Sequence, residues 1–503
     1  MKKIVFFIGV LFVSITNAQD ISDALRYADQ NIQGTARFRA MGGAFGALGG
    51  DLSAIQINPA GSAVFLNSQL SVTLAGAGYG SDIYYGNGIN TQTGSNLNFN
   101  QLGAVFVYGD ASGSSPINKF TLTLAYDQTS DNEFQFTAFG NTSTSIDSYF
   151  LNQAQGVPLD LLERRSGESI SDLYSFLGET EGYAVQQAYL GYESFILEAD
   201  DPSDPDNTSY FSNIGSGSFY QEYAYQSTGL NGKFSVNGAA QINNDFYLGL
   251  NLNSHFINYD RVTDFFEANT NAGSNINEVL FTNRLSTRGA GFSAQVGAIA
   301  KVSDLIRLGF AVESPTWYTI EEETTQDLET FSEVDGVAVV APDVINIFPE
   351  YQLRTPASYT ASIAFLFGRQ GLISLDYKYK DYTTTKFSSD FGNDYTDLNN
   401  SIVSTYKETS TIRLGGEWRN ENWSFRGGYV YEESPFKNEL LRSDRTGISF
   451  GLGYNWGKYK LDFAYDVMQQ ESFERFYPGS DFFNGAVVDT YRDNLTFTFG
   501  INF

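Results

Sequence analysis

The 503-residue sequence contains no cysteine and a single histidine, His255. The absence of cysteine excludes disulfide frameworks, thiolate zinc sites and cysteine nucleophiles. Basic residues are also scarce, with 30 Lys and Arg against 58 Asp and Glu, which gives a formal net charge of −28. Binding to a phosphate backbone requires clustered Lys and Arg. The composition therefore excludes a nucleic-acid partner.

Long hydrophobic runs are missing as well. After the first residues no stretch approaches the roughly 18 apolar residues of a transmembrane helix, and the mean hydropathy is −0.24. This excludes a helical membrane protein. It does not exclude a transmembrane β-barrel, because barrel strands alternate apolar and polar residues and their hydropathy averages out. The chain is instead rich in Phe (42), Tyr (32) and Gly (49).

The N-terminus has the three parts of an export signal. Lys2 and Lys3 form a positive region, residues 4–15 form an apolar core, and Thr16-Asn17-Ala18 is a small-residue cleavage site. We predict a signal peptide over residues 1–18 and a mature chain that begins at Gln19. A permanent membrane anchor is less consistent with so short a core.

Residues 34–61 contain seven glycines in 28 residues. Gly42, Gly46 and Gly50 are four residues apart, so on a helix they would form one bare face that another backbone can approach closely. Nucleotide-loop spacings such as Gly-x-Gly-x-x-Gly are absent. We interpret residues 19–67 as a hatch, a plug ahead of a β-rich region.

Two polar residues are expected to organise this hatch. Asp51 can cap a second short helix, and Pro59 should end it, because the residue before proline avoids helical geometry. Asn58 carries amide donors and acceptors that can tie the end of the hatch to a surrounding wall.

From Ser68 onward the hydrophobic period changes to two residues, the period of a β-strand. In the last strand one face carries Tyr491, Leu495, Phe497, Phe499, Ile501 and Phe503, while the other carries Arg492, Asn494, Thr496, Thr498 and Asn502. Tyr and Trp recur at strand ends, as in the aromatic girdles of membrane barrels. We predict an all-β fold, a transmembrane antiparallel β-barrel of about 14 strands over residues 68–503.

Connection lengths provide an independent indication. Tight turns are expected at Asn243-Asn244, Ser303-Asp304, Gly368-Arg369-Gln370, Asn420-Glu421 and Gly457. Long connections alternate with them, the largest over residues 139–228 and 321–350. Short turns on one side and long loops on the other are typical of outer-membrane barrels. The two long segments are expected to be extracellular.

The long segments carry much of the acidity. Residues 139–228 contain fourteen Asp or Glu, and residues 321–350 contain nine. The simpler interpretation is a solvated surface. The sharper alternative is binding of divalent cations at the lipopolysaccharide surface, for which residues 200–206 are rich in Asp but lack the glycine and terminal glutamate of an EF-hand loop. We predict no metal site and no cofactor.

Catalysis is not expected. His255 shares the predicted lumen face with Asn251 and Asn253, whereas Ser254 points the other way. A hydrolase needs its histidine beside a nucleophile or a carboxylate. Some charged residues are predicted to face inward, among them Arg413, Glu417, Lys460 and Asp462. We interpret them as forming charge pairs along the lumen wall or as holding the plug.

Several motifs resemble the FadL/TodX family of outer-membrane transporters for long-chain fatty acids and hydrocarbons. These are Met41-Gly42-Gly43-Ala44-Phe45, Ile57-Asn58-Pro59-Ala60-Gly61, Arg354-Thr355-Pro356-Ala357-Ser358-Tyr359 and Phe425-Arg426-Gly427-Gly428-Tyr429, followed by Gly451-Leu452-Gly453-Tyr454 and Leu461-Asp462-Phe463-Ala464-Tyr465. The resemblance spans essentially the mature chain. It implies a 14-stranded barrel in a Gram-negative outer membrane, a hatch that blocks the lumen, and exit into the periplasm or laterally through the wall.

Function and site residues follow from this resemblance. It implies hatch-gated uptake of hydrophobic small molecules, with long-chain fatty acids or related apolar compounds as substrates. The gating residues would be Gly42, Gly43, Gly46, Asn58, Pro59 and Ala60. Ligand contacts are assigned to Phe38, Met41, Phe45, Leu48 and Ile55, for which simple packing of plug against wall is the alternative. The expected partners are a hydrophobic ligand, outer-membrane lipids and lipopolysaccharide, and the expected state is a monomer.

One other function stays open at this point, a general porin or a structural or surface-binding barrel. The hatch favours the transporter, because a general porin has no use for a separate small-residue segment.

Overall fold

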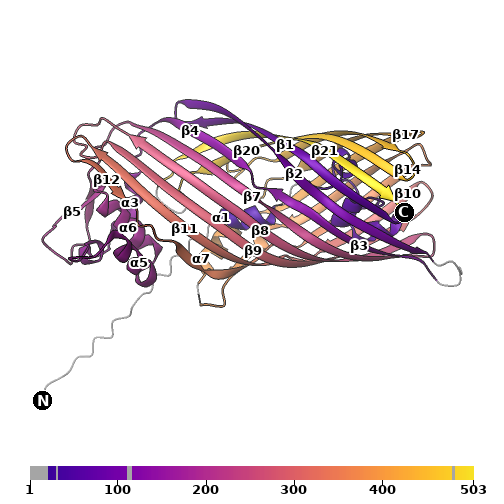
Figure 1. The fold of residues 1–503 in the computed structure, drawn as a ribbon, viewed down its shortest axis with the longest axis horizontal. Coiled ribbons are helices and arrows are strands. Elements are labelled where there is room, and N and C mark those ends of the chain that lie inside the picture. The colour runs from indigo at the N-terminus through magenta and orange to yellow at the C-terminus, as the bar shows by residue number, and fades with distance from the viewer. Residues whose placement is uncertain (1–20, 30–31, 110–115, 393, 478–481) are drawn as a thin grey trace, which may run out of the picture.

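An antiparallel sheet that closes on itself forms the body of the molecule (Figure 1). The computed structural model describes residues 21–29, 32–109, 116–392, 394–477 and 482–503. The predicted signal peptide, residues 1–18, lies outside the described residues. The first and last strands pair from Gln69 with Asn502 to Tyr84 with Val487, so the sheet is a closed barrel.

Within the described residues the main sheet has nineteen strand segments, which make fourteen barrel strands. Four barrel strands are each split into two segments, and β12 (Gly336–Val340) is an added arm. In chain order the barrel strands are β1 (Gln69–Tyr85), β2 (Gly88–Gly109), β3 (Ile117–Asp131) with β4 (Phe134–Thr142), β7 (Phe219–Ile242), β8 (Phe246–Ala268), β9 (Glu278–Lys301), β10 (Ile306–Glu313) with β11 (Trp317–Ser332), β13 (Asn346–Arg354) with β14 (Ser358–Phe367), β15 (Gly371–Asp381) with β16 (Lys386–Ser388), β17 (Glu408–Asn420), β18 (Trp423–Glu432), β19 (Arg445–Asn455), β20 (Tyr459–Arg475) and β21 (Gly485–Asn502).

The predicted tight turns all join neighbouring strands at one end of the barrel, called here the turn end. Asn243, Glu421, Gly368 and Gly457 have positive φ there, the backbone region that tight hairpin turns use. The predicted alternation is also confirmed. Along β20, Leu461 and Tyr465 are exposed on the outside, whereas Asp462 and Asp466 are buried inside.

Exposed aromatic rings gather on the outer surface at the turn end. Ring pairs link neighbouring strands, with centroids 5.4 Å apart for Trp418 and Phe425 and 4.7 Å apart for Trp423 and Tyr454. These are the strand-end aromatics that the sequence places in an interface girdle.

The chain ahead of β1 lies inside the barrel, as the predicted hatch does (Figure 1). It contains α1 (Ile21–Ala28), α2 (Ala36–Ala40) and two 3₁₀ helices, η1 (Leu52–Gln56) and η2 (Pro59–Val64). Helix α2 packs against β18, β19, β20 and β21, whereas η2 packs against β3, β7, β8 and β9 on the opposite wall. Residues 32–67 are called the hatch below, and α1 is treated separately.

The other end of the barrel, the cap end, is closed by a folded cap, residues 143–218 (Figure 1). It contains α3 (Asp147–Ala154), α4 (Leu159–Leu162), α5 (Ile170–Thr180), α6 (Tyr183–Glu193) and a small sheet of β5 (Leu197–Ala199) and β6 (Tyr210–Ser212). None of the helices in the described part of the chain is long and apolar enough to cross a membrane.

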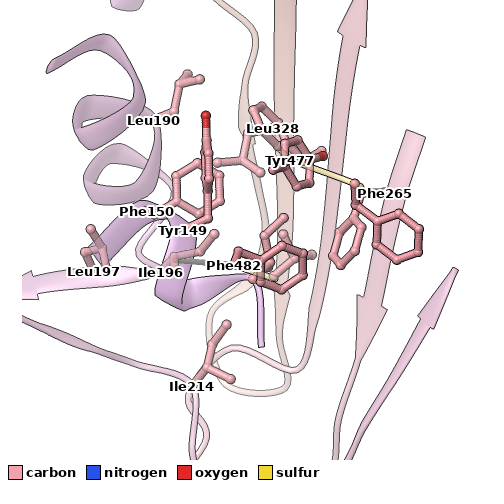
Figure 2. Packing of buried hydrophobic residues seen from close by; sticks show 14 of the residues in the cluster. Tyr149, Phe150, Leu190, Ile196, Leu197, Ile214, Phe265, Leu328, Tyr477 and Phe482 are labelled. Atoms are coloured by element: carbon pink, nitrogen blue, oxygen red, sulfur yellow. The ribbon is translucent and has the colours of Figure 1, made fainter. Parts of the chain in front are cut away.

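The cap and the barrel wall share one apolar core (Figure 2). Phe150 of α3 lies 5.3 Å from the ring of Phe281 in β9, and Phe265 of β8 lies 5.7 Å from the ring of Phe482. All four side chains are fully buried. The acidic residues of this segment are thus the outer surface of a packed subdomain.

Two segments differ from the sequence-based expectation. Residues 321–350 are strand rather than loop over most of their length, because β11 continues to Ser332 and residues 336–340 and 346–350 belong to β12 and β13. Along β11, Glu321, Glu323 and Glu329 are exposed. Glu322 is buried inside the barrel, and Leu328 packs against the cap. Residues 139–142 and 219–228, the two ends of the other predicted long connection, belong to β4 and β7. Helix α7 (Thr396–Thr405) buries Ile402 in a cluster that also contains Leu25 of α1.

Candidate functional site

Capping side chains define each turn of the hatch. Thr35 caps α2, with its Oγ1 accepting from Phe38 N at 3.2 Å. Thr35 Oγ1 also donates to Asp51 Oδ1 at 2.6 Å. Asp51 in turn caps η1 by accepting from Ser53 N at 3.0 Å, so the helix cap predicted for this residue is confirmed.

Asn58 and Pro59 begin η2 rather than end a longer helix. Asn58 Oδ1 accepts from Ala60 N at 3.1 Å, and Pro59 occupies the first helical position, where its missing N–H costs nothing. Asn58 Nδ2 donates to Gly46 O at 2.7 Å within the hatch and to Ala298 O of β9 at 3.0 Å. One buried amide therefore joins two parts of the hatch to the wall.

The glycines of the hatch do not form one helical face, so that expectation is wrong. Gly42, Gly43, Gly49 and Gly50 have φ between +60° and +73°, and the chain there runs through turns. Only glycine adopts this region without steric cost. Gly46 needs the absence of a side chain for a different reason. It lies so close to the wall that a Cβ at this position would collide with Ser362.

The wall contributes glycines of its own, which the sequence interpretation missed. An added Cβ would collide with hatch backbone at Gly249, Gly309 and Gly428, with the Ala40 side chain at Gly451, and with Asn58 at Gly297. These residues lie on β8, β9, β10, β18 and β19. A glycine inside a strand marks a place where another backbone approaches closely, and this signal was available in the sequence.

Buried ion pairs hold the other side of the hatch. Arg37 Nε lies 2.9 Å from Glu417 Oε2 of β17, and the same carboxylate pairs with Arg426 of β18 at 2.6 Å. Arg426 Nη1 also reaches Asp462 Oδ1 of β20 at 2.7 Å. The Glu417 side chain is fully buried. Glu417 thus pairs with the plug, whereas Asp462 pairs with Arg426 and Lys460 of the wall. The two predicted roles of the inward charges, holding the plug and pairing along the lumen wall, fall to different residues.

A second pair anchors α2. Arg39 binds Asp466 with two hydrogen bonds, of 2.8 and 2.9 Å, in the bidentate geometry that favours arginine over lysine. Arg39 Nη1 donates to Gln33 Oε1 at 2.7 Å. The charges on α2 are therefore paired directly with the barrel.

Helix α1 occupies the lumen between the hatch and the cap. Its Leu25 and Tyr27 pack in an apolar cluster with Tyr318, Tyr351 and Tyr382 of the wall. All of these side chains are buried. The helix thus lies in a chamber lined with aromatic rings.

The residue that follows α1, Asp29, forms ion pairs with two arginine side chains. Arg442 lies 2.6 Å away and Arg445 3.3 Å away. Burial alone would raise the pKa of the Asp29 carboxyl, but the charges of Arg445 and Arg442 lower that pKa well below its usual range. Asp29 therefore stays ionised and keeps the end of α1 tied to β19.

The five apolar residues predicted to contact ligand lie in closed packing. Phe38, Met41, Phe45 and Leu48 form one buried cluster with Ala364 and Leu372 of the wall, and the rings of Phe38 and Phe45 are 5.4 Å apart. Ile55 is fully buried as well. The structure brings the first four together. Their role toward a ligand remains a proposal.

The barrel wall has a break in its hydrogen-bond ladder, called here the wall window. Strand β2 pairs with β3 only over residues 101–109, and β4 pairs with β7 on its other side. Among the described residues no ladder pairs join residues 88–100 of β2 to residues 128–142 of the next strand. The sequence interpretation missed this break, which nothing in the alternation of these strands signals.

Side chains bridge the wall window in place of the backbone. Tyr79 OH accepts from Gln135 N at 3.0 Å, and Asn90 Nδ2 donates to Thr137 O at 2.8 Å. A cavity of about 140 Å³ lies at the window. Because only side chains span it, this part of the wall can open without breaking a continuous ladder.

The remaining candidates show no arrangement for chemistry. His255 is buried in the lumen, with Nε2 2.9 Å from Ser293 Oγ, and no carboxylate hydrogen-bonds to it among the described residues. The described residues also contain no cluster of His, Cys, Asp or Glu able to hold a metal ion, the Asp-rich stretch at 200–206 included.

The fold and the site together define a plugged transmembrane barrel of the outer-membrane type. Residues 208–500 match the family described as outer membrane protein transport protein (OMPP1/FadL/TodX). The match covers more than half of the 503 residues. The chain belongs to this family, which is a family of outer-membrane transport proteins and not of enzymes.

Solved structures support the same fold. The chain is similar to a Pseudomonas aeruginosa FadL homologue, with a TM-score of 0.53 and 12% identity over 94% of this chain and 99% of that chain. It is also similar to the P. putida toluene transporter TodX, with a TM-score of 0.52 and 12% identity over the same shares. No curated protein matches the chain.

Proposed function

We propose that the protein takes up hydrophobic small molecules across the outer membrane by hatch-gated passage, with long-chain fatty acids or related apolar compounds as its substrates. The observation that carries this proposal is the hatch, which is held to opposite walls of the lumen by Asn58 and by Arg37. A general porin needs an open aqueous lumen. The name of the toluene transporter, a similar structure, supports an apolar substrate.

The cap end is then the extracellular end and the turn end faces the periplasm. Long connections outside and short turns inside are the rule for outer-membrane barrels. The segments 139–228 and 321–350 lie at the cap end in this orientation. Because the protein has no native cysteine, single cysteines at the exposed positions Asp204 and Asn244 can be labelled on intact cells with an impermeant maleimide. Labelling of Asp204→Cys alone is expected, and the reverse pattern would invert the orientation.

A ligand first has to displace α1 from the aromatic chamber. The chamber is apolar and already closed by side chains, so a hydrophobic ligand can replace the buried contacts of Leu25 and Tyr27. The gating residues Gly42, Gly43, Gly46, Asn58, Pro59 and Ala60 would then let the hatch shift. Phe38, Met41, Phe45, Leu48 and Ile55 would form the surface that the ligand meets as the hatch moves.

Exit through the wall window is the route that we favour. Side chains rather than ladder pairs bridge β2 and β4 there, so opening requires few backbone bonds to break. A lateral exit delivers an apolar molecule into the membrane without crossing water, which is favourable for hydrophobic surface. The surrounding outer-membrane lipids and lipopolysaccharide contact the exposed apolar face of the barrel, and a closed single-chain barrel can act as a monomer.

An uptake assay tests the proposal. The chain is expressed in a host that lacks its own fatty-acid transporter, and uptake of labelled oleate and toluene is compared with that of a small sugar. We expect uptake of at least one apolar compound and exclusion of the sugar. Passage of the sugar without uptake of either apolar compound would identify a general porin. Mass spectrometry of molecules that co-purify with the barrel would identify the native ligand class.

A further inference from the structure

Strand β12 lies at the cap end and has a neighbour on one side only (Figure 1). Its residues 336–340 pair with residues 328–332 of β11, which pair with β9 on their other side. Among the described residues, no strand and no backbone hydrogen bond reaches the second edge of β12. This edge of the sheet, called here the open edge, is therefore unpaired.

The open edge lies well outside the membrane. Val337 pairs with Phe331, and Phe331 pairs with Glu278, the first residue of β9. Strand β9 has 24 residues, which at about 3.4 Å per residue and a tilt of about 45° rise on the order of 55 Å. The apolar band of an outer-membrane barrel is roughly 25 Å tall, and the aromatic girdle described above is at the turn end. Membrane lipid therefore does not cover β12.

The side chains of the open edge are apolar and accessible. Residues 336–340 have the sequence Gly-Val-Ala-Val-Val, and Val337 and Val339 are 59% and 55% exposed. Natural proteins protect unpaired edge strands with lysine, proline or a bulge, because an open edge can pair with another chain. Strand β12 has no lysine and no proline. It thus has the properties of an edge that is kept open for pairing.

The opposite face of β12 is fixed in place. Val340 is buried in the apolar core that the cap shares with the wall. Ser171 Oγ of α5 donates to the carbonyl oxygen of Pro342, just beyond the strand. A binding surface that is already ordered costs little conformational entropy when a partner binds. The open edge is therefore a preformed template for a further strand.

The charge around the open edge defines the chemistry of its partner. Residues 321–350 contain nine acids and no Lys or Arg. Glu329 is exposed opposite Val339, and Glu333 and Asp335 are exposed in the hairpin that precedes β12. Lys and Arg place their aliphatic stems along apolar surface and keep the charged group in water, so such residues can cover the valines and face these acids. A second copy of the chain would bring like charges together, which is unfavourable.

We propose that β12 is a docking edge for a partner protein, which adds an extended segment of alternating basic and β-branched residues to the sheet as one more strand. Main-chain hydrogen bonds would supply affinity, and the side chains that lie on Val337 and Val339 would supply specificity. The proposal goes beyond the proposed function and takes from it only the extracellular position of the cap end.

Peptide binding to the purified full-length protein tests the proposal. The probe is a fluorescent peptide of about seven residues with alternating Lys and Val. One reference peptide has the same sequence with methylated backbone nitrogens, and another has Glu in place of Lys. Binding is followed by fluorescence anisotropy, and hydrogen exchange reports protection of the amides of residues 336–340. We expect methylation to weaken binding at least about tenfold, because several main-chain hydrogen bonds are lost together, and the Glu peptide to bind more weakly still.

Variants of the protein locate the binding site. Val339→Lys places a like charge on the open edge and should weaken binding of the Lys peptide at least about tenfold. Val334→Lys adds the same charge in the hairpin before β12, at a residue that is 87% exposed and outside the ladder, and should change binding less than about twofold. Heat-modifiable migration reports assembly. If Val339→Lys does not assemble, Val337→Lys provides the same comparison.

Protection of residues 336–340 by the Lys peptide, lost on methylation and in Val339→Lys, supports the proposal. No binding, equal binding of the methylated peptide, equal losses in Val339→Lys and Val334→Lys, or tighter binding of the Glu peptide overturns it. Self-association of the protein that Val339→Lys abolishes also overturns it, because the occupant is then a second copy. These measurements do not depend on transport, so a protein that takes up no apolar compound overturns the proposed function alone.

Discussion

The two ends of the barrel are closed in different ways. The hatch is held by directional polar contacts, among them the Arg37–Glu417 and Arg39–Asp466 pairs and the Asn58 amide, over wall glycines that let backbones approach. The cap is held by a broad apolar core around Phe150, Phe281 and Phe482. Polar contacts with the wall accompany this core. Glu267 of β8 accepts from Ile146 N at 2.9 Å, and Gln326 of β11 accepts from Tyr174 OH at 2.9 Å.

This difference determines how easily the hatch and the cap can be released from the barrel wall. Hydrogen bonds and ion pairs hold the hatch in one position. They can break one at a time, so the hatch can be released from the wall in steps. The stabilisation from the apolar core of the cap scales with the apolar area that is buried, and it is not lost in such steps. We therefore infer that the cap is a stable lid and that the hatch is the part that moves.

Removing the hatch should have the largest effect. Deletion of residues 20–60 is expected to leave a barrel that assembles, because its strand ladder is closed. Single-channel conductance in planar bilayers should rise, and polar solutes should pass. A deleted barrel that assembles yet conducts like the parent would mean that the cap alone closes the lumen.

Glu417→Gln should release the hatch on its charged side. Removing one partner of a buried ion pair typically costs about 3–5 kcal/mol, because the remaining charges stay buried. Arg37 loses its ion-pair partner here, whereas Arg426 keeps Asp462, so spontaneous openings of the hatch in bilayers should become more frequent. The matched control is Arg284→Gln, whose exposed pair with Asp327 should contribute about 0–1 kcal/mol. An equal frequency of openings in the two variants would contradict the inference that buried ion pairs hold the hatch.

Phe150→Ala should loosen the cap and leave the hatch in place. Truncating a fully buried phenylalanine costs about 3–5 kcal/mol, and proteolysis within the cap should become faster. Phe176, which is 45% exposed in the same cap, provides the control variant Phe176→Ala with little change. Bilayer leakage from Phe150→Ala without faster cap cleavage would argue against separate roles for the two closures.

Gly428→Ala tests the close approach between hatch and wall. The added methyl would collide with the backbone at Gly42, and overpacking of this kind costs about 1–3 kcal/mol. We expect leakage in bilayers with normal assembly. Gly76→Ala is the matched control, because no atom lies within 4 Å of its added Cβ. Leakage from both variants would indicate a general effect of alanine in the barrel strands.

The smallest effect is expected from substitutions at Asn58 and Pro59, where η2 begins. Replacing Asn58 and Pro59 with alanine removes a cap worth about 0.5–2 kcal/mol together with the bond to Ala298 O. Heat-modifiable migration should be unchanged, whereas uptake of oleate should differ from the wild type. An unchanged uptake rate would assign gating to the charged side of the hatch alone.

The sequence predicted the barrel better than its closures. Strand alternation and turn residues are local signals, and they placed turns such as Asn243-Asn244 and Gly457 correctly. The hatch was recognised from its glycines, but their role was misjudged, because positive φ at Gly42 and Gly43 depends on how the chain folds inside the barrel. The spacing of strand and turn signals predicted a long connection at residues 321–350, although Leu328 belongs to a strand that packs against the cap.

The sequence alone determined the barrel class, the number of barrel strands and the existence of a plug, because period-two alternation, turn chemistry and glycine content are properties of neighbouring residues. The tertiary structure decided the ion partners of Arg37, the wall glycines beneath the hatch and the wall window between β2 and β4. Arg37 and Glu417 are 380 residues apart in the chain. Such contacts depend on the register of the closed barrel, which places distant strands side by side.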